Sequence, residues 1–309
     1  MPERWLVTGA GGFLATNFTA NVGFKNIEIT GQARNDRYAK AYDNFLVGDL
    51  RDFANLMPAI RALRPDVIVH AAAISGHETA ERDRAQATTV NVEVTGQLAQ
   101  IAEDIGSKFV FISTDAVFSG ESGGYLESDA VSPFSFYGET KVLGEQRALN
   151  SCATSLIIRT NFFGWSSTKS RSVLEFFVNS YRDRQSIFGY PDFIVTSTYV
   201  QTLINNIHDL VDLDTSGIVN VVSSDPCSKY EFGLLIAEAF AFDKSLISPQ
   251  PADSGNHLIS RTRDLSLRTE LLQSLLGRTS ESQFAGICRA RDDEATVGSQ
   301  LRSILLGND

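Results

Sequence analysis

A glycine-rich turn near the N-terminus constrains the fold of this chain more than any other feature. The short apolar segment Trp5–Val7 leads directly into Thr8–Ala15, where small residues recur at every third position as Gly9, Gly12 and Ala15. Glycines between a strand and a helix allow backbone N–H groups to approach a diphosphate at the helix N-terminus. The segment therefore predicts a dinucleotide-binding strand, turn and helix. Its expected cofactor contacts are Gly9, Gly11, Gly12, Phe13 and Leu14.

Predicted strands and helices alternate over the first half of the chain. The expected strands are Trp5–Val7, Asn26–Thr30, Phe45–Val47, Asp66–His70, Phe109–Ile112 and Leu156–Ile158. Helices are expected at Arg51–Leu63 and Glu81–Ile105, and from Tyr137 onward. Such alternation is typical of a parallel sheet that binds ligands at the carboxyl ends of its strands. The predicted fold class is therefore α/β, a doubly wound Rossmann sheet with a smaller C-terminal substrate-binding lobe.

The alternation becomes less regular after Trp165. The pattern there predicts five helices, a strand at Ile218–Val222 and a loop at Ser248–Gly255. The helices are Val173–Tyr181, Tyr199–Leu213, Lys229–Phe240, Arg268–Leu276 and Gly298–Leu306. Apart from that last helix, the final thirty residues are expected to lie at the surface. We expect residues 1–165 to form the dinucleotide-binding domain. Residues 166–309 would form mainly the substrate-binding lobe, from which an element could return to the main sheet.

Composition excludes several classes of function. The net charge of −10 argues against a general nucleic-acid surface, which needs a basic patch. No stretch approaches the roughly 20 apolar residues of a membrane span, and the N-terminus has no signal-peptide pattern. The three cysteines, Cys152, Cys227 and Cys288, are far apart and odd in number, which disfavours a metal site or a disulfide framework. We therefore expect a cytoplasmic protein with no metal.

Three polar residues suggest proton-transfer chemistry. One of them follows a predicted strand, and the other two lie in the first turns of a predicted helix. Tyr137 and Lys141 are four residues apart, so they share one face of a helix, and Thr114 can meet them from the end of Phe109–Ile112. A free tyrosine keeps its proton until about pH 10. A nearby ammonium or an oxidised nicotinamide lowers that pKa, so the tyrosine can exchange a proton with a carbonyl or alcohol. A Tyr-x-x-x-Lys pair is common by chance, and the glycine turn at the same sheet edge gives this one its significance.

The expected cofactor is NADP(H) in preference to NAD(H). In dinucleotide-binding folds an acidic residue at the end of the second strand binds the ribose 2′-hydroxyl. That place falls near Gly31, where no acid is found and Arg34 follows closely. An arginine suits a 2′-phosphate, whereas Glu28, if it faced the ribose, would favour NAD. The small residues Ala71–Ala73 would let the nucleotide lie against the strand ends, and His70 and His77 are interpreted as structural or loop residues.

Several segments together carry a resemblance to a known family. They are VTGAGGFLA at Val7–Ala15, VGDLRD at Val47–Asp52, RPDVIVHAAA at Arg64–Ala73, STDAVFSG at Ser113–Gly120, YGETKVLGEQ at Tyr137–Gln146 and RTNFFGW at Arg159–Trp165. With these the chain resembles the extended short-chain dehydrogenase/reductases, and most closely the dTDP-4-dehydrorhamnose reductase group. The resemblance covers roughly Arg4–Trp165 and weakens beyond it.

The resemblance implies an oxidoreductase that reduces a keto group on a nucleotide-linked 6-deoxysugar with a nicotinamide cofactor. Tyr137 would be the general acid, Lys141 its pKa partner and ribose ligand, and Thr114 the anchor of the carbonyl. Asp49 and Leu50 would lie by the adenine, with Asn91 as a further cofactor contact. By position, the substrate contacts would be Thr114, Asp115, Asn161, Phe162 and Arg261. A homodimer is also expected.

The sequence departs from the family on the substrate side. Phe162 stands where the family has tryptophan, and Arg261–Leu265 replaces its Arg-Pro-x-Asn-Ser segment. Related 4,6-dehydratases carry Thr-Asp-Glu, whereas this chain has Ala116 after Asp115, which counts against dehydration. Two alternatives stay open: a sugar-nucleotide epimerase of the same fold, and a non-catalytic regulatory subunit that binds the dinucleotide.

Overall fold

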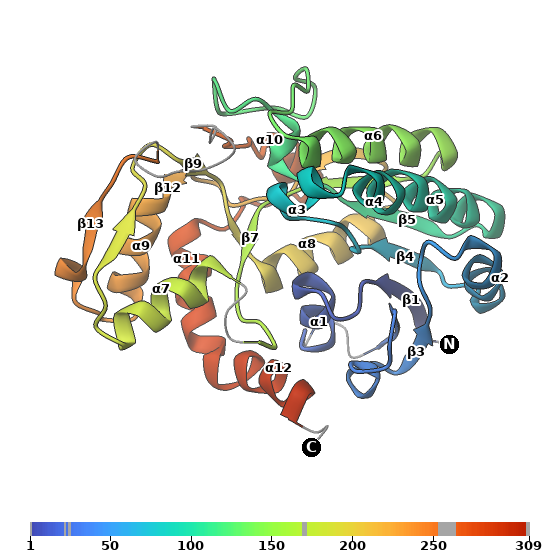
Figure 1. Ribbon diagram of the computed structural model, residues 1–309, viewed down its shortest axis with the longest axis horizontal. Coiled ribbons are helices and arrows are strands. Elements are labelled where there is room, and N and C mark those ends of the chain that lie inside the picture. Colours follow the sequence, from blue (N-terminus) through green and yellow to red (C-terminus); the bar gives the residue numbers. More distant parts are fainter. Residues whose placement is uncertain (1, 22, 24–25, 169–171, 253–263, 307–309) are drawn as a thin grey trace.

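The computed structural model, which describes residues 2–21, 23, 26–168, 172–252 and 264–306, is built on one seven-stranded sheet (Figure 1). Its strand order is β11-β6-β5-β4-β1-β2-β3, and all neighbouring strands are parallel. The strands are β1 (Glu3–Thr8), β2 (Ile27–Ala33), β3 (Asn44–Val47), β4 (Val67–His70), β5 (Lys108–Ile112), β6 (Leu156–Arg159) and β11 (Gly217–Asn220). The chain reverses its direction of winding at β1 and β4, and this arrangement confirms the predicted doubly wound Rossmann sheet.

Helices cover both faces of the sheet because alternate strand residues point to opposite sides. Leu6 and Ile68 pack on one side with α2 (Phe53–Leu63), α5 (Val94–Ile105) and α6 (Phe136–Ser151). Trp5 and Val7 pack on the other side with α1 (Phe13–Thr19) and α8 (Val200–Asp212). Strands buried on both faces read as continuous apolar runs, which is why the sequence located them well.

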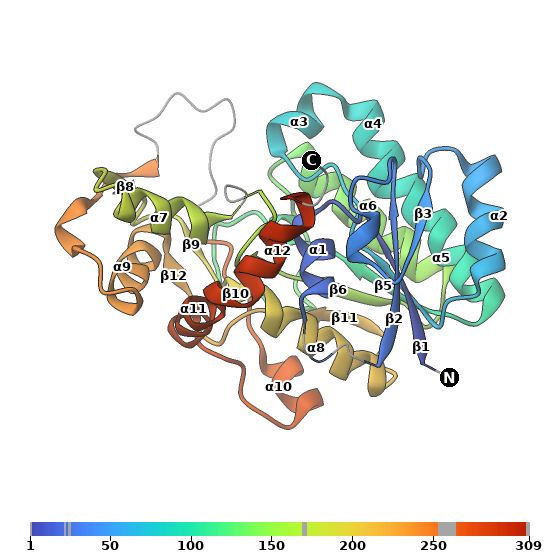
Figure 2. The same cartoon turned by 90° about the horizontal axis from the view of Figure 1, so that it is seen from below.

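The C-terminal elements gather beside the sheet, at the end far from the N-terminus in both views (Figures 1 and 2). The helices are α7 (Val173–Arg182), α9 (Lys229–Ala239), α10 (Glu270–Leu276), α11 (Gln283–Asp292) and α12 (Val297–Leu306). Three two-stranded sheets join β7 (Phe162–Phe163) to β10 (Thr198–Tyr199), β9 (Ile194–Val195) to β12 (Cys227–Ser228), and β8 (Ile187–Gly189) to β13 (Ile247–Pro249). Phe177, Phe232 and Ile287 of this lobe belong to the same buried cluster as Trp5 and Val7. The lobe and the sheet therefore share one core.

One strand of the sheet comes from the second half of the chain. Residues Gly217–Asn220 form β11, which pairs with β6 in register Ile218 to Ile157. Helix α8 likewise covers the sheet although it follows residue 165. The predicted boundary at that residue stays a prediction. None of the helices in the described ranges has the length and apolar composition that crossing a membrane requires.

Three expected elements differ from the structure. The helix expected over Glu81–Ile105 is interrupted at Asp83, which separates α3 (His77–Arg82) from α4 (Arg84–Thr88); five residues of π-helix, Thr89–Glu93, then lead into α5. The Asp83 carboxylate accepts the Gln86 N–H and so begins a new helix. The loop expected at Ser248–Gly255 begins inside β13. In the final thirty residues, expected to lie at the surface apart from the terminal helix, the structure adds helix α11, which buries Ile287.

A buried ion pair ties α6 to the sheet. Glu145 of α6 accepts hydrogen bonds from Nε and one terminal nitrogen of Arg159, at 3.0 and 2.7 Å. It also accepts the hydroxyl of Ser113 at 2.5 Å. The side chains of Arg159 and Glu145 are only 3% and 4% exposed. Removing one partner of such a pair leaves the other charge buried without compensation.

We predict that Glu145→Gln lowers the free energy of unfolding by about 3–5 kcal/mol, measured by urea denaturation. The matched control is Glu294→Gln. This change breaks the ion pair between Glu294 and Arg182, in which the Arg182 side chain is 44% exposed. That change should cost less than about 1 kcal/mol. Equal losses in the two variants would contradict the assigned role of the buried pair.

Candidate active site

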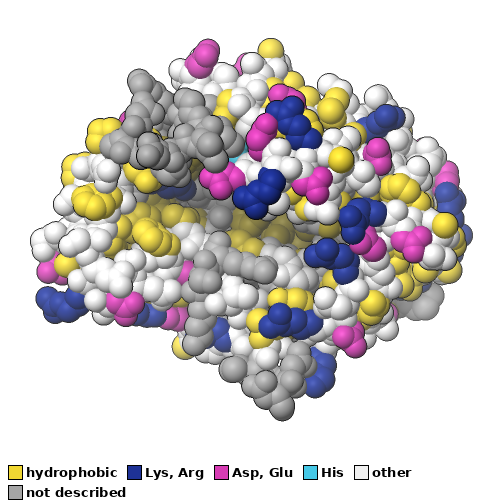
Figure 3. Space-filling model, viewed as in Figure 1, with side chains coloured by type: hydrophobic (Ala, Val, Ile, Leu, Met, Phe, Trp, Pro, Cys, Tyr) yellow, Lys and Arg dark blue, Asp and Glu magenta, His cyan; other side chains and the backbone are white. Residues whose placement is uncertain are grey.

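A cleft of about 1420 Å³ runs along the carboxyl ends of the strands. Figure 3 shows the surface hollowed between the sheet and the C-terminal lobe, with apolar side chains visible inside the hollow. The cleft includes the position between β1 and β4, from which the chain adds strands in opposite directions. In doubly wound sheets, ligands usually bind at this position. Its walls include most of the residues that the sequence singles out. These are Gly9, Gly11, Gly12, Phe13, Leu14, Arg34, Asp49, Leu50, Ala71, Ala72, Ala73, Thr114, Asp115, Tyr137, Lys141, Asn161 and Phe162.

The glycine turn has the backbone shape that its sequence predicts. Gly9 has φ +72°, and a Cβ there would lie 2.9 Å from the Cα of Ala72. Gly12 places its N–H 2.7 Å from the Gly9 carbonyl oxygen, and a Cβ on Gly12 would meet that same oxygen at 2.9 Å. Helix α1 then begins at Phe13 with no capping side chain among the described residues. Its first N–H groups are therefore available to an anion such as a diphosphate.

Arg34, the cation expected to bind the ribose 2′-phosphate, lines the cleft. Strand β2 extends to Ala33, three residues beyond its expected end, so Arg34 directly follows the strand. Glu28 lies near the opposite end of β2 and accepts a hydrogen bond from Asn44. The Arg51 guanidinium lowers the pKa of Asp49 through a bidentate hydrogen bond, at 2.9 and 2.6 Å. Among the described residues that line this end of the cleft are Arg34 and Arg51, and the only carboxylate, that of Asp49, is paired with Arg51, which suits a 2′-phosphate.

One predicted cofactor contact lies behind the cleft wall. Asn91 is fully buried and does not line the cleft. Its side-chain oxygen accepts the Ile74 N–H at 2.9 Å, and its amide nitrogen donates to the Thr140 hydroxyl at 2.9 Å. Asn91 therefore joins the segment after β4 to the helix that carries Tyr137 and Lys141. Arg261 lies outside the described residues.

Helix α6 and the segment after β5 bring Thr114, Tyr137 and Lys141, which were predicted to be catalytic (the catalytic trio), to one part of the cleft. Helix α6 begins after Ser135, whose hydroxyl accepts the Gly138 N–H at 3.2 Å. Burial raises the pKa of Tyr137 to about 12, although a hydrogen bond with Thr114 partly opposes this rise. Tyr137 therefore holds its proton at neutral pH, which is the form a general acid requires.

Lys141 is 1% exposed and lies at the base of the cleft. Its ammonium donates to the Ile112 carbonyl oxygen at 2.6 Å and lies 3.8 Å from the centre of the Phe111 ring. Burial lowers the pKa of Lys141 to about 7, while the charge of Glu145 acts in the opposite direction. The ammonium is thus poised to change its charge near neutral pH as ligands enter the cleft.

The substrate side of the cleft is polar at Asp115 and apolar at Phe162. The Asp115 carboxylate accepts the Thr114 hydroxyl at 3.0 Å and the Asn161 amide at 2.7 Å. Burial raises the pKa of Asp115, and the nearby positive charge of Lys229 partly opposes this rise. Phe162 packs on Phe13 of the glycine turn, with ring centres 5.5 Å apart. The substrate side therefore directly adjoins the cofactor turn.

Comparison with known proteins agrees with this geometry. The profile of the RmlD substrate binding domain family matches residues 3–293. The chain belongs to the RmlD substrate binding domain family. This confirms the resemblance to the extended short-chain dehydrogenase/reductases of the dTDP-4-dehydrorhamnose reductase group.

Proteins with similar sequences or structures carry the names of different functions. The chain is 31% identical to methionine adenosyltransferase 2 subunit beta of Danio rerio, over 91% of this chain and 87% of that protein. It is 28% identical to dTDP-4-keto-6-deoxy-D-glucose reductase of Streptomyces niveus, over 82% and 84%. A hypothetical dTDP-4-dehydrorhamnose reductase from Sulfolobus tokodaii has a similar solved structure, with 28% identity, a TM-score of 0.79 and coverage of 90% and 97%.

Some cleft residues of this RmlD family member were not identified from the sequence. His77 lies edge-on to Tyr137, with ring centres 5.2 Å apart, and its Nδ1 is 2.9 Å from the Ser135 hydroxyl. Phe134, Phe193 and Leu265 also line the cleft. The sequence predicts only a structural or loop role for His77, because a lone histidine carries no spacing signal. Phe193 and Leu265 reach the cleft only through tertiary packing.

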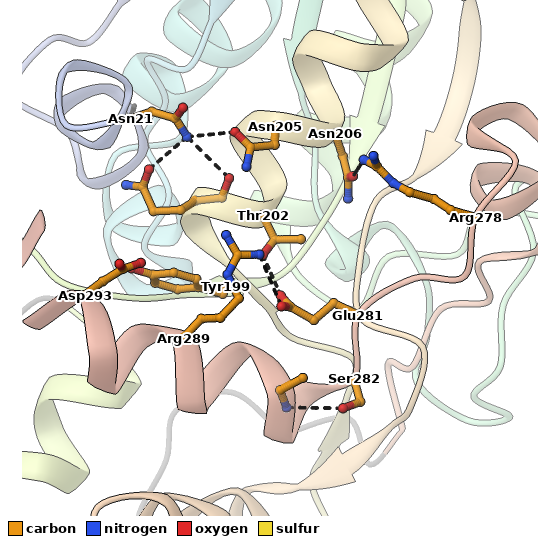
Figure 4. Close-up of polar contacts among 12 residues, drawn as sticks. Asn21, Tyr199, Thr202, Asn205, Asn206, Arg278, Glu281, Ser282, Arg289 and Asp293 are labelled. Atoms are coloured by element: carbon orange, nitrogen blue, oxygen red, sulfur yellow. Dashed lines mark hydrogen bonds and ion pairs between the residues drawn. The ribbon is translucent and has the colours of Figure 1, made fainter. Parts of the chain in front are cut away.

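A second cavity of about 640 Å³ is lined by residues of α8, α10 and α11 and of the loop before α11 (Figure 4), and it has no lining residue in common with the cleft. Arg289 donates to the Thr202 hydroxyl at 3.0 Å and to Glu281 at 3.2 Å. Arg278 donates to Asn206 at 2.8 Å and to Asp209 at 2.5 Å. Both cations that line this cavity are therefore already paired, and we assign these contacts to the joining of the C-terminal helices.

The low pKa of Lys141 predicts a pH-dependent contribution to stability. Between about pH 7 and pH 10.5 the unfolded chain binds more protons at this lysine than the folded protein does. The free energy of unfolding should therefore rise with pH over this interval. Lys141→Met should have a smaller rise than the parent in urea denaturation at a series of pH values. Lys244→Met, at an exposed lysine paired with Glu238, should keep the parent's slope, and identical slopes in all three proteins would contradict the assignment.

Proposed function

We propose that this protein is an NADPH-dependent reductase of a keto group on a nucleotide-linked 6-deoxysugar. The observation that carries the proposal is the convergence of the glycine turn, Arg34 and the catalytic trio on one cleft. Membership of the RmlD family supports the same conclusion, as do relatives named as dTDP-4-dehydrorhamnose and dTDP-4-keto-6-deoxy-D-glucose reductases. A solved structure with 24% identity and a TM-score of 0.84 is described as a complex with NADP.

The residues present fit NADP(H). The glycine turn leaves N–H groups free at the start of α1 for the diphosphate, and Arg34 offers a cation for the 2′-phosphate. Ala71–Ala73 provide a wall without large side chains. When bound, NADPH supplies the hydride.

The chain's own residues handle the proton. Tyr137 donates its phenolic proton to the carbonyl oxygen as the carbon is reduced, so the keto group becomes an alcohol. The Thr114 hydroxyl donates to Asp115 in this structure, and because a hydroxyl proton can rotate, it can turn to the same carbonyl oxygen. The charge of Lys141 favours the phenolate that remains, which then regains a proton from solvent.

Replacement of the general acid tests the mechanism. Tyr137→Phe should reduce kcat with a dTDP-linked 4-keto-6-deoxysugar by about 100- to 10,000-fold, because the proton donor is lost. NADPH affinity should change little. The measurement is loss of NADPH absorbance, with fluorescence titration for affinity. Tyr181→Phe removes a phenol that donates to the Gly233 carbonyl in the C-terminal lobe, and it should keep the parent rate. A Tyr137→Phe protein with the parent rate would sink the mechanism.

The preference for NADPH is tested at Arg34. Arg34→Ala should weaken NADPH binding by about 10- to 100-fold and leave NADH binding nearly unchanged, since only NADPH has the 2′-phosphate. Arg37→Ala is the matched control, because Arg37 is nearby but does not line the cleft. If the ratio of the two dissociation constants stays constant in Arg34→Ala, another group binds the phosphate.

A regulatory role is the second candidate function. It is favoured by the 31% identity with a protein named as the beta subunit of methionine adenosyltransferase 2. A regulatory subunit would bind the dinucleotide without oxidising NADPH on any keto sugar. The catalytic trio argues for turnover. The expected cytoplasmic location and homodimer stay predictions.

A further inference from the structure

Tyr137 lies in the first turn of α6, directly after the residue that caps this helix. Backbone N–H groups in the first turn of a helix have no partner within the helix. Ser135 provides one, because its hydroxyl accepts the Gly138 N–H at 3.2 Å. Its carbonyl oxygen accepts the Glu139 N–H at 3.0 Å and so makes the first bond of the helix. The orientation of Tyr137 therefore depends on how firmly Ser135 is held.

His77, the first residue of α3, contacts this end of α6 at three places. Its Nδ1 lies 2.9 Å from the Ser135 hydroxyl oxygen. Its ring stacks on Phe134, with ring centres 5.3 Å apart, and lies edge-on to Tyr137 at 5.2 Å. His77, Phe134 and Tyr137 all line the cleft. The imidazole thus holds the capping serine and packs on residues before and after it.

The hydrogen bonds of Ser135 indicate where the imidazole carries its proton. Ser135 is 6% exposed, and its oxygen already accepts the Gly138 N–H. Among the described residues, the acceptor for its single hydroxyl proton is Nδ1 of His77. With a proton on Nδ1, this buried hydroxyl would have no acceptor. A neutral His77 protonated on Nε2 satisfies every group, and one chain of hydrogen bonds then runs from Gly138 through Ser135 to His77.

We infer that His77 is a positioning residue that acts on the general acid Tyr137 through Ser135. The inference rests on the proposed function, which assigns proton donation to Tyr137. Without the acceptor on His77, the Ser135 hydroxyl could turn away from Gly138, and the turn that carries Tyr137 would loosen. Lys141 lies one turn further on and is held separately by the Ile112 carbonyl oxygen. Loss of the acceptor should therefore lower kcat and leave NADPH binding nearly unchanged.

Two replacements of His77 separate the hydrogen bond from the ring contacts. His77→Phe keeps a ring beside Tyr137 but has no acceptor, so kcat with a dTDP-linked 4-keto-6-deoxysugar should fall by about 10- to 100-fold. His77→Asn places a side-chain oxygen near the position of Nδ1 and should stay within about fivefold of the parent. Fluorescence titration should give both variants an NADPH dissociation constant within about twofold of the parent's. The matched control is His208→Phe, because His208 stacks on Trp5 outside the cleft, and it should keep the parent rate.

A double-mutant cycle tests whether His77 acts through Ser135. In a protein that already carries Ser135→Ala, His77→Phe should lower kcat by less than about threefold further, because the shared contact is gone. Fully additive losses would overturn the inference. So would a His77→Phe protein with the parent rate, or a His77→Asn protein as slow as His77→Phe.

The parent protein distinguishes this inference from the proposed function. A parent that turns over the keto sugar, with variants that break the expected order, overturns the role of His77 alone. A parent that binds NADPH but turns over no keto sugar overturns the positioning role and the proposed function together.

Discussion

The anchoring of α6 on the sheet is the constraint on which the rest of the site depends. The pair between Glu145 and Arg159 holds the middle of this helix to the sheet, and Gly144 lets the helix approach closely: a Cβ there would lie 2.6 Å from the Asn91 carbonyl oxygen. Asn91 in turn holds both Thr140 and the segment after β4. Tyr137 and Lys141 are therefore positioned by contacts made on the buried side of the helix, while their own side chains reach the cleft.

Because this anchoring is made within the protein, the polar groups of the cleft are oriented before any ligand binds. Ser135 fixes the first turn of α6, and Thr114 is held by the Ala116 N–H and by Asp115. Preorganised groups cost little reorganisation at the moment of reaction, which is the main source of electrostatic catalysis. The same burial keeps Tyr137 protonated and makes the charge of Lys141 sensitive to its surroundings.

The sequence predicted best what depends on local pattern. Buried parallel strands read as apolar runs, and the glycine turn follows its strand directly, so the sheet and the cofactor side could be located from neighbouring residues. Asp83 escaped prediction because its side chain competes with the helix for a backbone N–H. Helix α11 was missed because its buried positions carry mostly polar or small residues, such as Gln283, Gly286 and Ala290, and so show no clear apolar stripe. Phe193 could not be assigned, because its place in the cleft wall depends on how two distant parts of the chain pack.

The single core shared by the sheet and the C-terminal lobe has a consequence for how ligands enter. Phe163 and Tyr199, in the strands between the two regions, are fully buried against Phe232 and the helices of the lobe. A wide hinge motion would expose these aromatic surfaces to water at a large free-energy cost. A wide separation of the two regions is therefore disfavoured, and ligands would have to enter the cleft with this shared core intact.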